Sequence, residues 1–226
     1  MIKYIYINLD RRPDRRKHIE TQFKKSDIPM YERFEALDGN DLNKYNITLS
    51  EISLFKHSDF KHKSFTKNII GNQLSHIRAI QTLLDSKYGY AVIMQDDMLF
   101  IKNFKEEIDS ICDNLPQDAE IINIGFHQHA VYSKVIPFDL TANNTSHIQY
   151  KMNDFVCKLK PQVNPCSSCY IITKNGAQNF IDYIFKSGCK KATDHNFNEY
   201  LIDKGIFYGS TKVLCTGNDM GSDIFL

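Results

Sequence analysis

Short apolar segments typical of strands alternate along this chain with longer segments whose apolar residues recur at helical spacing. Residues 3–8 are β-branched and aromatic, and the segment after Pro13 carries Ile19 and Phe23 on one side of a helix. The expected strands are residues 3–8, 90–94, 120–125, 169–173 and 212–215, and the expected helices are residues 14–25, 71–84, 104–115, 175–185 and 194–204. Such alternation predicts an α/β fold with a mainly parallel sheet and helices on both faces.

Two segments lack this periodicity. Residues 40–68 are polar and are expected to be irregular, and residues 126–167 form a long connection that contains His127, His129 and His147. A connection of that length usually has a function, although these histidines lack the partners that would define a zinc site. We find no internal repeat and no linker, so we expect a single domain over residues 1–226.

Charge and cysteine content narrow the class of protein. The formal net charge of +1 argues against a nucleic-acid-binding protein, whose affinity would come from neutralising phosphates. Neither a signal peptide nor an apolar run of ~20 residues is recognised, which predicts no transmembrane segment. The six cysteines lack a disulfide spacing, so a cytoplasmic location with reduced thiols is expected. Whether the chain forms a homodimer is left open.

An acidic pair, Asp96 and Asp97, follows directly after the expected strand 90–94. Ligands of open α/β sheets bind beyond the carboxyl ends of the strands, so this is where a site is expected. Two adjacent carboxylates do not easily both stay ionised unless a cation or hydrogen-bond donors compensate them, and a divalent cation with oxygen ligands would do so. A solvated turn is the alternative interpretation.

A charged loop, residues 8–16, lies between the first expected strand and the first expected helix. Its arginines could bind a diphosphate in a bidentate manner, helped by the N-terminus of the helix. A solvated helix start is again the alternative.

Several motifs, in order along most of the chain, resemble those of the family 25 glycosyltransferases, which include bacterial lipooligosaccharide galactosyltransferases and collagen galactosyltransferase domains. The matching segments are residues 5–15 (IYINLDRRPDR), 34–39 (FEALDG), 71–77 (GNQLSHI), 92–97 (VIMQDD), 170–177 (YIITKNGA), Asp194 and residues 222–224 (SDI). Gln95 departs from the pattern, because that family usually carries Glu before the two aspartates.

The resemblance implies a GT-A-like nucleotide-diphospho-sugar transferase fold and an inverting hexosyltransferase. The donor would be a UDP-sugar, most often UDP-galactose, and Mn²⁺ (or Mg²⁺) would assist. The acceptor would be a glycan, a lipooligosaccharide or a hydroxylysine-type group. The class of acceptor does not follow from the sequence.

The resemblance also implies roles for single residues. Asp97 and Asp96 would hold the metal ion and the ribose-diphosphate part of the donor. The nucleotide would lie near Asn8, Asp10, Arg11, Arg15, Ser75 and His76. Inversion requires a base within ~3 Å of the acceptor hydroxyl. Asp194 is the candidate, with a helix N-cap as its alternative role, and Asp223 is a second candidate, as base or metal ligand.

The sequence is compatible with two other functions. A catalytically silent nucleotide-sugar or glycan-binding module is the first, and the missing carboxylate at Gln95 favours it. A magnesium-dependent phosphoryl-transfer protein is the second. The chain has no GxxxxGK[ST] loop to cradle phosphates, which argues against it.

Overall fold

The computed structural model describes residues 1–56, 66–126, 147–161, 163, 166–218, 220, 221 and 223. Its strands are β1 (Ile2–Asn8), β2 (Glu32–Glu35), β3 (Tyr90–Gln95), β4 (Met98–Phe100), β5 (Ile121–Asn123), β6 (Gly125–Phe126), β7 (Ile148–Lys151), β8 (Val156–Leu159), β9 (Cys169–Thr173), β10 (Tyr208–Ser210) and β11 (Cys215–Gly217). Its helices are α1 (Pro13–Lys25), α2 (Leu49–Ser53), α3 (Lys67–Leu84), α4 (Phe104–Asp113), α5 (Lys174–Ser187) and α6 (Thr193–Asp203), with a short 3₁₀ helix at Gly39–Lys44.

An eight-stranded sheet in the order β2-β1-β3-β9-β5-β10-β8-β7 forms the centre of the fold, and β4-β11-β6 form a second sheet of three strands. Strands β2, β1 and β3 are parallel neighbours, as are β5 and β10, whereas β9 runs antiparallel to both β3 and β5. The predicted α/β class is therefore confirmed, with a mixed, mostly parallel sheet.

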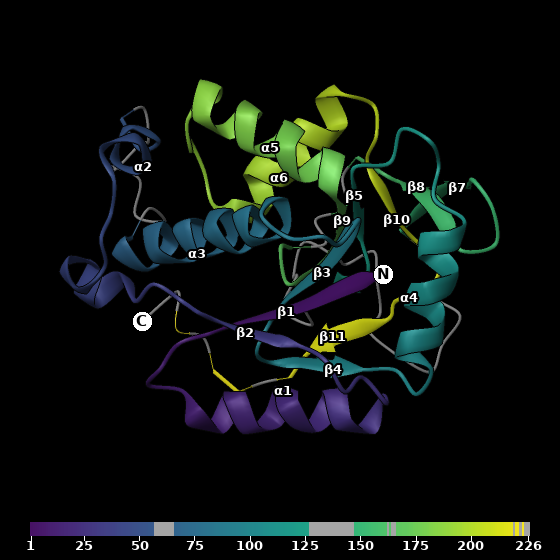
Figure 1. Cartoon of the computed structure of the whole chain (residues 1–226). Coiled ribbons are helices and arrows are strands. Elements are labelled where there is room, and N and C mark those ends of the chain that lie inside the picture. The colour runs from purple at the N-terminus through teal and green to yellow at the C-terminus, as the bar shows by residue number, and fades with distance from the viewer. Residues whose placement is uncertain are drawn as a thin grey trace.

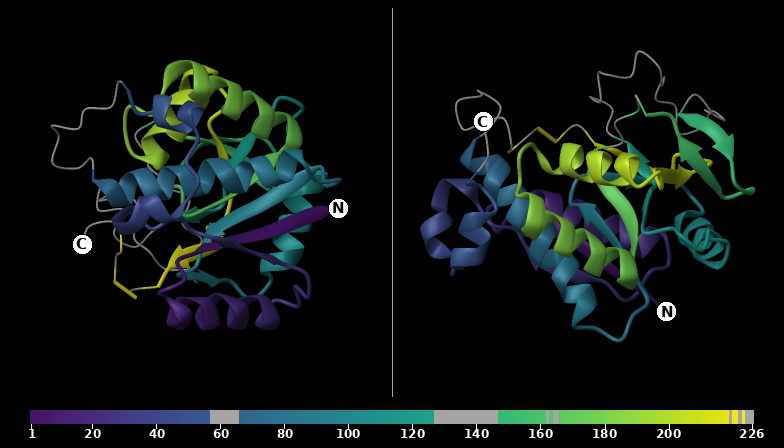
Figure 2. Two further views of the ribbon diagram at one scale, coloured as in Figure 1. Left: turned by 60° about the vertical axis from the view of Figure 1, so that its left-hand side comes forward. Right: turned by 90° about the horizontal axis from the view of Figure 1, so that it is seen from above.

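Helices cover both faces of the central sheet. Helix α1 lies on one face together with the three-stranded sheet, and helices α3, α5 and α6 lie on the other (Figures 1 and 2). The aromatic side chain of Phe23 in α1 packs against Tyr4 and Tyr6 of β1. The even-numbered side chains of β1 therefore face α1, and the odd-numbered ones face α3.

The core is apolar and continuous. Ile5, Ile93 and Ile171 from three neighbouring strands are fully buried in one cluster that includes apolar residues of both sheets. No helix of the described residues combines the length and the apolar character that crossing a bilayer requires.

The structure corrects several expected boundaries. Helix α3 begins at Lys67 rather than at Gly71, because Thr66 caps it and the apolar periodicity starts only later. The expected strand 212–215 is replaced by β10, which lies before it, and by β11, which begins at its last residue, Cys215. Within the expected connection 126–167, β7 and β8 form an antiparallel hairpin. Of the histidines predicted to be loop residues, His147 is buried just before β7, with Nε2 2.9 Å from the Ser210 carbonyl oxygen, and His127 and His129 lie outside the described residues.

Candidate active site

The carboxyl ends of β1, β2 and β3 lie at one edge of the central sheet, because these strands are parallel neighbours. Helices α1, α3 and α6 begin at the same edge, on the left of Figure 1, where the described part of the C-terminal segment also lies. Helix N-termini carry unpaired N–H groups and partial positive charge, so this edge favours an anionic ligand.

Asp96 is held at this edge by residues of β1 and α1. Asn8 Nδ2 donates a hydrogen bond of 2.6 Å to Asp96 Oδ2, and Arg15 Nη1 donates one of 3.1 Å to Oδ1. The register explains the contact with Asn8. Tyr6 of β1 pairs with Met94 of β3, so two residues later Asp96 faces α1 on the same side as Asn8.

The acidic pair is poorly hydrated. Asp96 and Asp97 are each only 5% exposed. Burial raises the pKa of Asp96 to about 6, and nearby Asp97 adds to the rise, although hydrogen bonding from Asn8 and the charge of Arg15 oppose it. An additional cation beside the pair would favour the ionised form of Asp96.

Arg15 is the cation that three carboxylates share. Its Nη1 lies 3.1 Å from Asp96 Oδ1 and 3.5 Å from Asp97 Oδ2, and its Nη2 lies 3.8 Å from Asp223 Oδ2. Nη2 also donates to the carbonyl oxygen of Gly221. The side chain is buried, so this guanidinium links α1, the end of β3 and the C-terminal segment.

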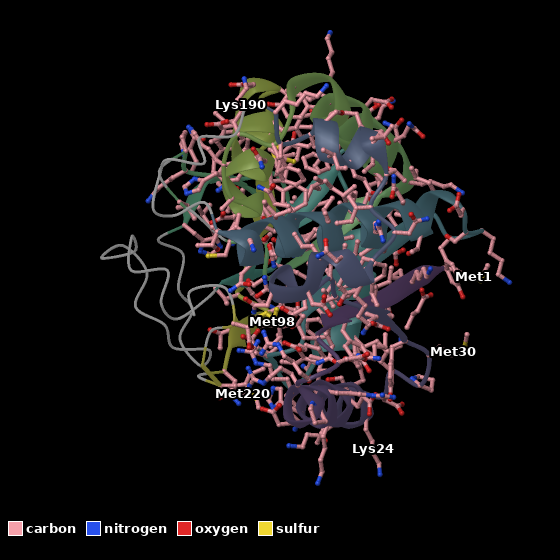
Figure 3. All side chains as sticks on the ribbon, turned by 90° about the vertical axis from the view of Figure 1, so that its left-hand side faces the viewer. Met1, Lys24, Met30, Met98, Lys190 and Met220 are labelled. Carbon is pink, nitrogen blue, oxygen red and sulfur yellow. The ribbon has the colours of Figure 1, made fainter. Side chains whose placement is uncertain are left out.

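Asp223 lies against the charged loop. Arg11 Nη1 donates to its Oδ1 over 2.5 Å, and Arg12 Nη1 donates to its Oδ2. Burial opposes ionisation, but the hydrogen bonds from Arg11 and Arg12 hold the pKa of Asp223 below its ordinary value. In Figure 3, which views this edge face-on, nitrogen atoms gather between the labelled Met98 and Met220. The charged loop that was predicted to bind a diphosphate therefore binds the carboxylate of Asp223.

Asp10 lies apart from this cluster. Its exposed carboxylate receives a 2.5 Å hydrogen bond from Arg33 Nη2, and Lys44 Nζ lies 3.6 Å away. Arg33 also donates to Asn8 Oδ1 over 3.0 Å. Asp10 is therefore connected to the site only through Arg33 and Asn8 in the contacts that the described residues make.

Ser75 and His76 are buried inside the α3 face of the sheet. Ser75 Oγ donates to the Gly71 carbonyl oxygen over 2.6 Å and accepts from the Leu37 N–H over 2.8 Å, so it fastens α3 to the segment after β2. His76 Nδ1 lies 3.0 Å from the hydroxyl of Tyr170. Burial lowers the pKa of His76 to about 3, so the ring is neutral. Their predicted role near a nucleotide stays a prediction.

Asp194 occupies the second position of α6 rather than its cap. The N-cap is Ala192, which makes no side-chain cap bond, so the alternative role of Asp194 as an N-cap is not what the structure shows. Its Oδ1 accepts from the N–H of His195 over 2.9 Å. The adjacent Thr193 donates to Asn72 Oδ1 over 2.8 Å, which places the start of α6 against α3. Its predicted role as base stays a prediction.

The donor set of the acidic pair fits a hard divalent cation. Asp96 and Asp97 offer carboxylate oxygens, which are the ligands that such an ion prefers, and burial raises the pKa of Asp96, so an added cation would favour its ionised form. Within the described residues no group of three or more His, Cys, Asp or Glu side chains is arranged to hold a metal ion. An ion here would thus use these two carboxylates together with oxygen atoms of a substrate, which is common for Mg²⁺.

Arg12 and Asp38 belong to the site but were not predicted from the sequence. Arg12 lies in the predicted loop but was not singled out, although it binds Asp223, and it also donates to the Met220 carbonyl oxygen over 3.0 Å. Asp38 accepts a 2.6 Å hydrogen bond from Arg11 Nε and so orients that guanidinium. The position of Asp38 in the segment FEALDG was the available signal.

The family model described as glycosyltransferase family 25 (LPS biosynthesis protein) matches residues 1–196. The chain belongs to this family. The matched part of this family 25 chain contains Asn8, Arg15, the acidic pair and Asp194, whereas Asp223 lies beyond it.

Individual relatives agree with this assignment. A putative glycosyltransferase of Acanthamoeba polyphaga mimivirus is 34% identical over 125 residues, which are 55% of this chain and 37% of that protein. Procollagen galactosyltransferase 2 of Homo sapiens is 29% identical over 124 residues, 53% of this chain and 20% of that protein. A putative glycosyltransferase of Haemophilus influenzae is 36% identical over 115 residues, 48% of this chain and 38% of that protein. The matches thus span well under half of these relatives.

Among solved structures, mouse xyloside xylosyltransferase 1 in its apo form is similar at 7% identity, with a TM-score of 0.49 over 92% of this chain and 84% of that chain. The galactosyltransferase LgtC in complex with donor and acceptor sugar analogs is similar at 10% identity, with a TM-score of 0.42 over 96% of this chain and 73% of that chain. At these scores the likenesses add nothing to the family assignment.

Proposed function

We propose that this family 25 chain transfers a hexose, with galactose as the expected sugar, from a UDP-sugar to a hydroxyl group of a glycan, lipooligosaccharide or hydroxylysine-type acceptor, with inversion at the anomeric carbon. The observation that carries the proposal is the position of Arg15. This guanidinium lies within 4 Å of Asp96, Asp97 and Asp223, so groups that bind cations and groups that bind anions meet at one strand edge. A metal-bound diphosphate requires both kinds of group.

The reaction requires compensation of the negative charge that develops on the leaving UDP. As the bond between the anomeric carbon and the diphosphate oxygen breaks, UDP takes the electron pair and gains negative charge. Arg11, Arg12 and Arg15 compensate that charge once the diphosphate replaces Asp223 as their anion. A divalent ion on Asp96 and Asp97 would supply a Lewis acid to the same oxygens.

The acceptor hydroxyl attacks the opposite side of the anomeric carbon and loses its proton to a base. Asp194 is proposed as that base, because it lies in the first turn of α6 at the same edge. Asp223 is the second candidate, although its bonds to Arg11 and Arg12 hold its pKa low and make it a weak base.

A nucleotide-sugar-binding module without turnover is the second candidate function, and Gln95 is the residue that favours it. Gln95 pairs in register with Ile7 and so faces α3, whereas Asp96 faces α1. The missing carboxylate at position 95 therefore leaves the acidic pair itself intact. A cytoplasmic location stays a prediction from the cysteine pattern.

Hydrolysis of a panel of UDP-sugars with Mn²⁺, and then with a chelator, tests the proposal. We expect UDP release from one donor, loss of release with chelator and at least a hundredfold loss in Asp97→Ala. Asp182→Ala serves as the control, because Asp182 is an exposed carboxylate of α5. UDP binding without release in the presence of acceptors would favour the binding module, and absence of both would contradict the proposal.

A further inference from the structure

Polar atoms from α3 and from the residue before β9 are buried without a hydrogen-bond partner among the described residues. They are Gln73 Oε1, His76 Nε2 and Ser168 Oγ. Their residues are 1%, 0% and 1% exposed, respectively. A buried polar group without a partner is unfavourable, so it calls for an explanation, and a ligand that supplies the missing partner is one.

Strand register and helical spacing place these side chains on the α3 face of the sheet. The backbone N–H of Gln95 donates to the Ser168 carbonyl oxygen over 2.8 Å, and Ile93 pairs with Tyr170. Ser168 and Tyr170 are two residues apart and therefore lie on the same face, which is the face of His76, since His76 Nδ1 contacts the Tyr170 hydroxyl. Gln95 lies on that face as well, opposite Ser168.

Gln73 lies one helical turn before His76, on the same side of α3. Helix α3 is joined to β3 by a short connection and runs antiparallel to it (Figure 1). Gln73 therefore lies roughly 4.5 Å closer than His76 to the edge at which β3 ends. Ser168 likewise lies roughly 6.6 Å closer than Tyr170 to that edge, because β9 runs antiparallel to β3. Gln73, Ser168 and Gln95 thus lie at the same end of the sheet.

This end of the α3 face adjoins the start of α6. Gln73 Nε2 donates to the carbonyl oxygen of Lys191, and Asn196 Nδ2 donates to the same oxygen over 2.8 Å. Asp194, the proposed base, lies between Lys191 and Asn196 in the sequence. Gln95 is partly exposed, so the group formed by Gln73, Ser168 and Gln95 meets solvent at that residue. We call these three side chains the neutral cluster.

The chemistry of the neutral cluster differs from that of the opposite face. Its amides and hydroxyl carry no charge, and the adjacent His76 is neutral because burial lowers its pKa to about 3. A phosphate would find no compensating cation among them, whereas Arg11, Arg12 and Arg15 lie on the α1 side. Uncharged hydroxyl groups can donate to Gln73 Oε1 and accept from Ser168, which matches a sugar ring.

We propose that the neutral cluster binds hydroxyl groups of the transferred hexose, while the arginines of the α1 face bind the diphosphate. The inference rests on the proposed function, and it assigns donor-sugar recognition to Gln73, Ser168 and Gln95. His76 and Tyr170 are positioning residues behind them. Such a site discriminates among donors, because a donor that lacks the matching hydroxyl leaves a buried polar group unpaired.

Calorimetric titration of UDP and of UDP-hexose into the wild type, Ser168→Ala and Ser86→Ala tests the inference. Ser168 Oγ has no hydrogen-bond partner to lose among the described residues, so Ser168→Ala should leave the melting temperature unchanged or higher. It should weaken UDP-hexose binding about five- to tenfold and leave UDP binding unchanged. Ser86 lies at the opposite end of α3, and its Oγ donates to the Leu83 carbonyl oxygen and accepts from the Tyr88 N–H. Ser86→Ala should therefore lower stability without changing either affinity.

A set of UDP-hexoses that each lack one hydroxyl completes the test. The wild type should bind one of them about five- to tenfold more weakly than the parent donor, and Ser168→Ala should bind that analog and the parent equally. If Ser168→Ala binds UDP-hexose as tightly as the wild type does, or loses UDP and UDP-hexose equally, the inference is wrong while the proposed function stands. A wild type that binds UDP but gains nothing from the hexose also overturns the inference alone. A wild type that binds neither ligand overturns the proposed function and this inference with it.

Discussion

Asn8 at the end of β1 donates a 2.6 Å hydrogen bond to the carboxylate of Asp96, which follows β3 and lies 88 residues further along the chain. The same side-chain amide donates to the Arg12 carbonyl oxygen over 3.1 Å, and its oxygen accepts from Arg33 over 3.0 Å. One buried amide therefore connects the first strand, the charged loop and the acidic pair.

Replacing Asn8 tests how far this amide organises the site. Asn8→Ala removes donors from Asp96 and from the loop, so we expect the free energy of unfolding to fall by about 1–3 kcal/mol. The pKa of Asp96 should also rise further, because hydrogen bonding from Asn8 lowers it. Chemical denaturation checks the first effect. Asn114→Ala, which loses only an exposed bond to the Ser110 carbonyl oxygen, should change stability by less than about 0.5 kcal/mol.

The raised pKa of Asp96 predicts a pH dependence of stability. An unfolded Asp has a pKa near 3.8 and the folded group titrates at about 6, so the folded state binds more protons between these values. Asp96 therefore contributes stability at low pH that is lost as pH rises through about 6, up to about 3 kcal/mol. Asp96→Asn cannot titrate, so the difference in unfolding free energy between the two proteins should change between pH 4 and pH 6. A difference that is constant with pH would show that Asp96 is already ionised at pH 4.

Arg15 is predicted to act as the internal counter-ion of the acidic site. Arg15→Gln leaves Asp96, Asp97 and Asp223 without their shared cation, so stability should fall by about 3 kcal/mol or more. Mn²⁺ should raise the melting temperature of this variant more than that of the wild type, because the ion supplies the lost charge. Arg16→Gln is the matched control, since the exposed Arg16 pairs with Glu20 one helical turn away rather than with the acidic site. An equal response of the wild type and Arg15→Gln to Mn²⁺ would mean that the carboxylates do not take up the ion.

Gly71 allows α3 to approach the segment after β2. A Cβ at this position would lie 2.4 Å from the Leu37 carbonyl oxygen and 2.9 Å from the Gly39 nitrogen, and these backbone atoms cannot yield easily. Gly71→Ala should therefore destabilise the protein by about 1–3 kcal/mol and displace Asp38 from Arg11. Gly89→Ala is the control, because a Cβ there meets nothing within 4 Å. Thermal denaturation of both variants tests this prediction. Equal melting temperatures of Gly71→Ala and Gly89→Ala would contradict it.

Local pattern located much of this fold. The strand and helix around the charged loop, and the strand before Asp96, were expected within about one residue of β1, α1 and β3. Strand β10 and the hairpin of β7 and β8 were missed, because they are short and their burial comes from neighbouring strands rather than from their own alternation. The direction of β9 was also not foreseen, since strand direction depends on how the preceding connection crosses the sheet.

The sequence by itself determined which residues stand at strand ends and helix starts. Period-two and period-3.6 patterns are local, and they placed Asn8, Arg15 and Asp96 next to the elements that carry them. Tertiary structure decided which of these side chains form ion pairs and hydrogen bonds with one another. It brought Asp223 to Arg11 and Arg12 across more than 200 residues, and it turned Gln95 toward α3 and Asp96 toward α1. The physical reason is that hydrogen bonds and ion pairs depend on a few ångströms of distance, which only the packed sheet and its register fix.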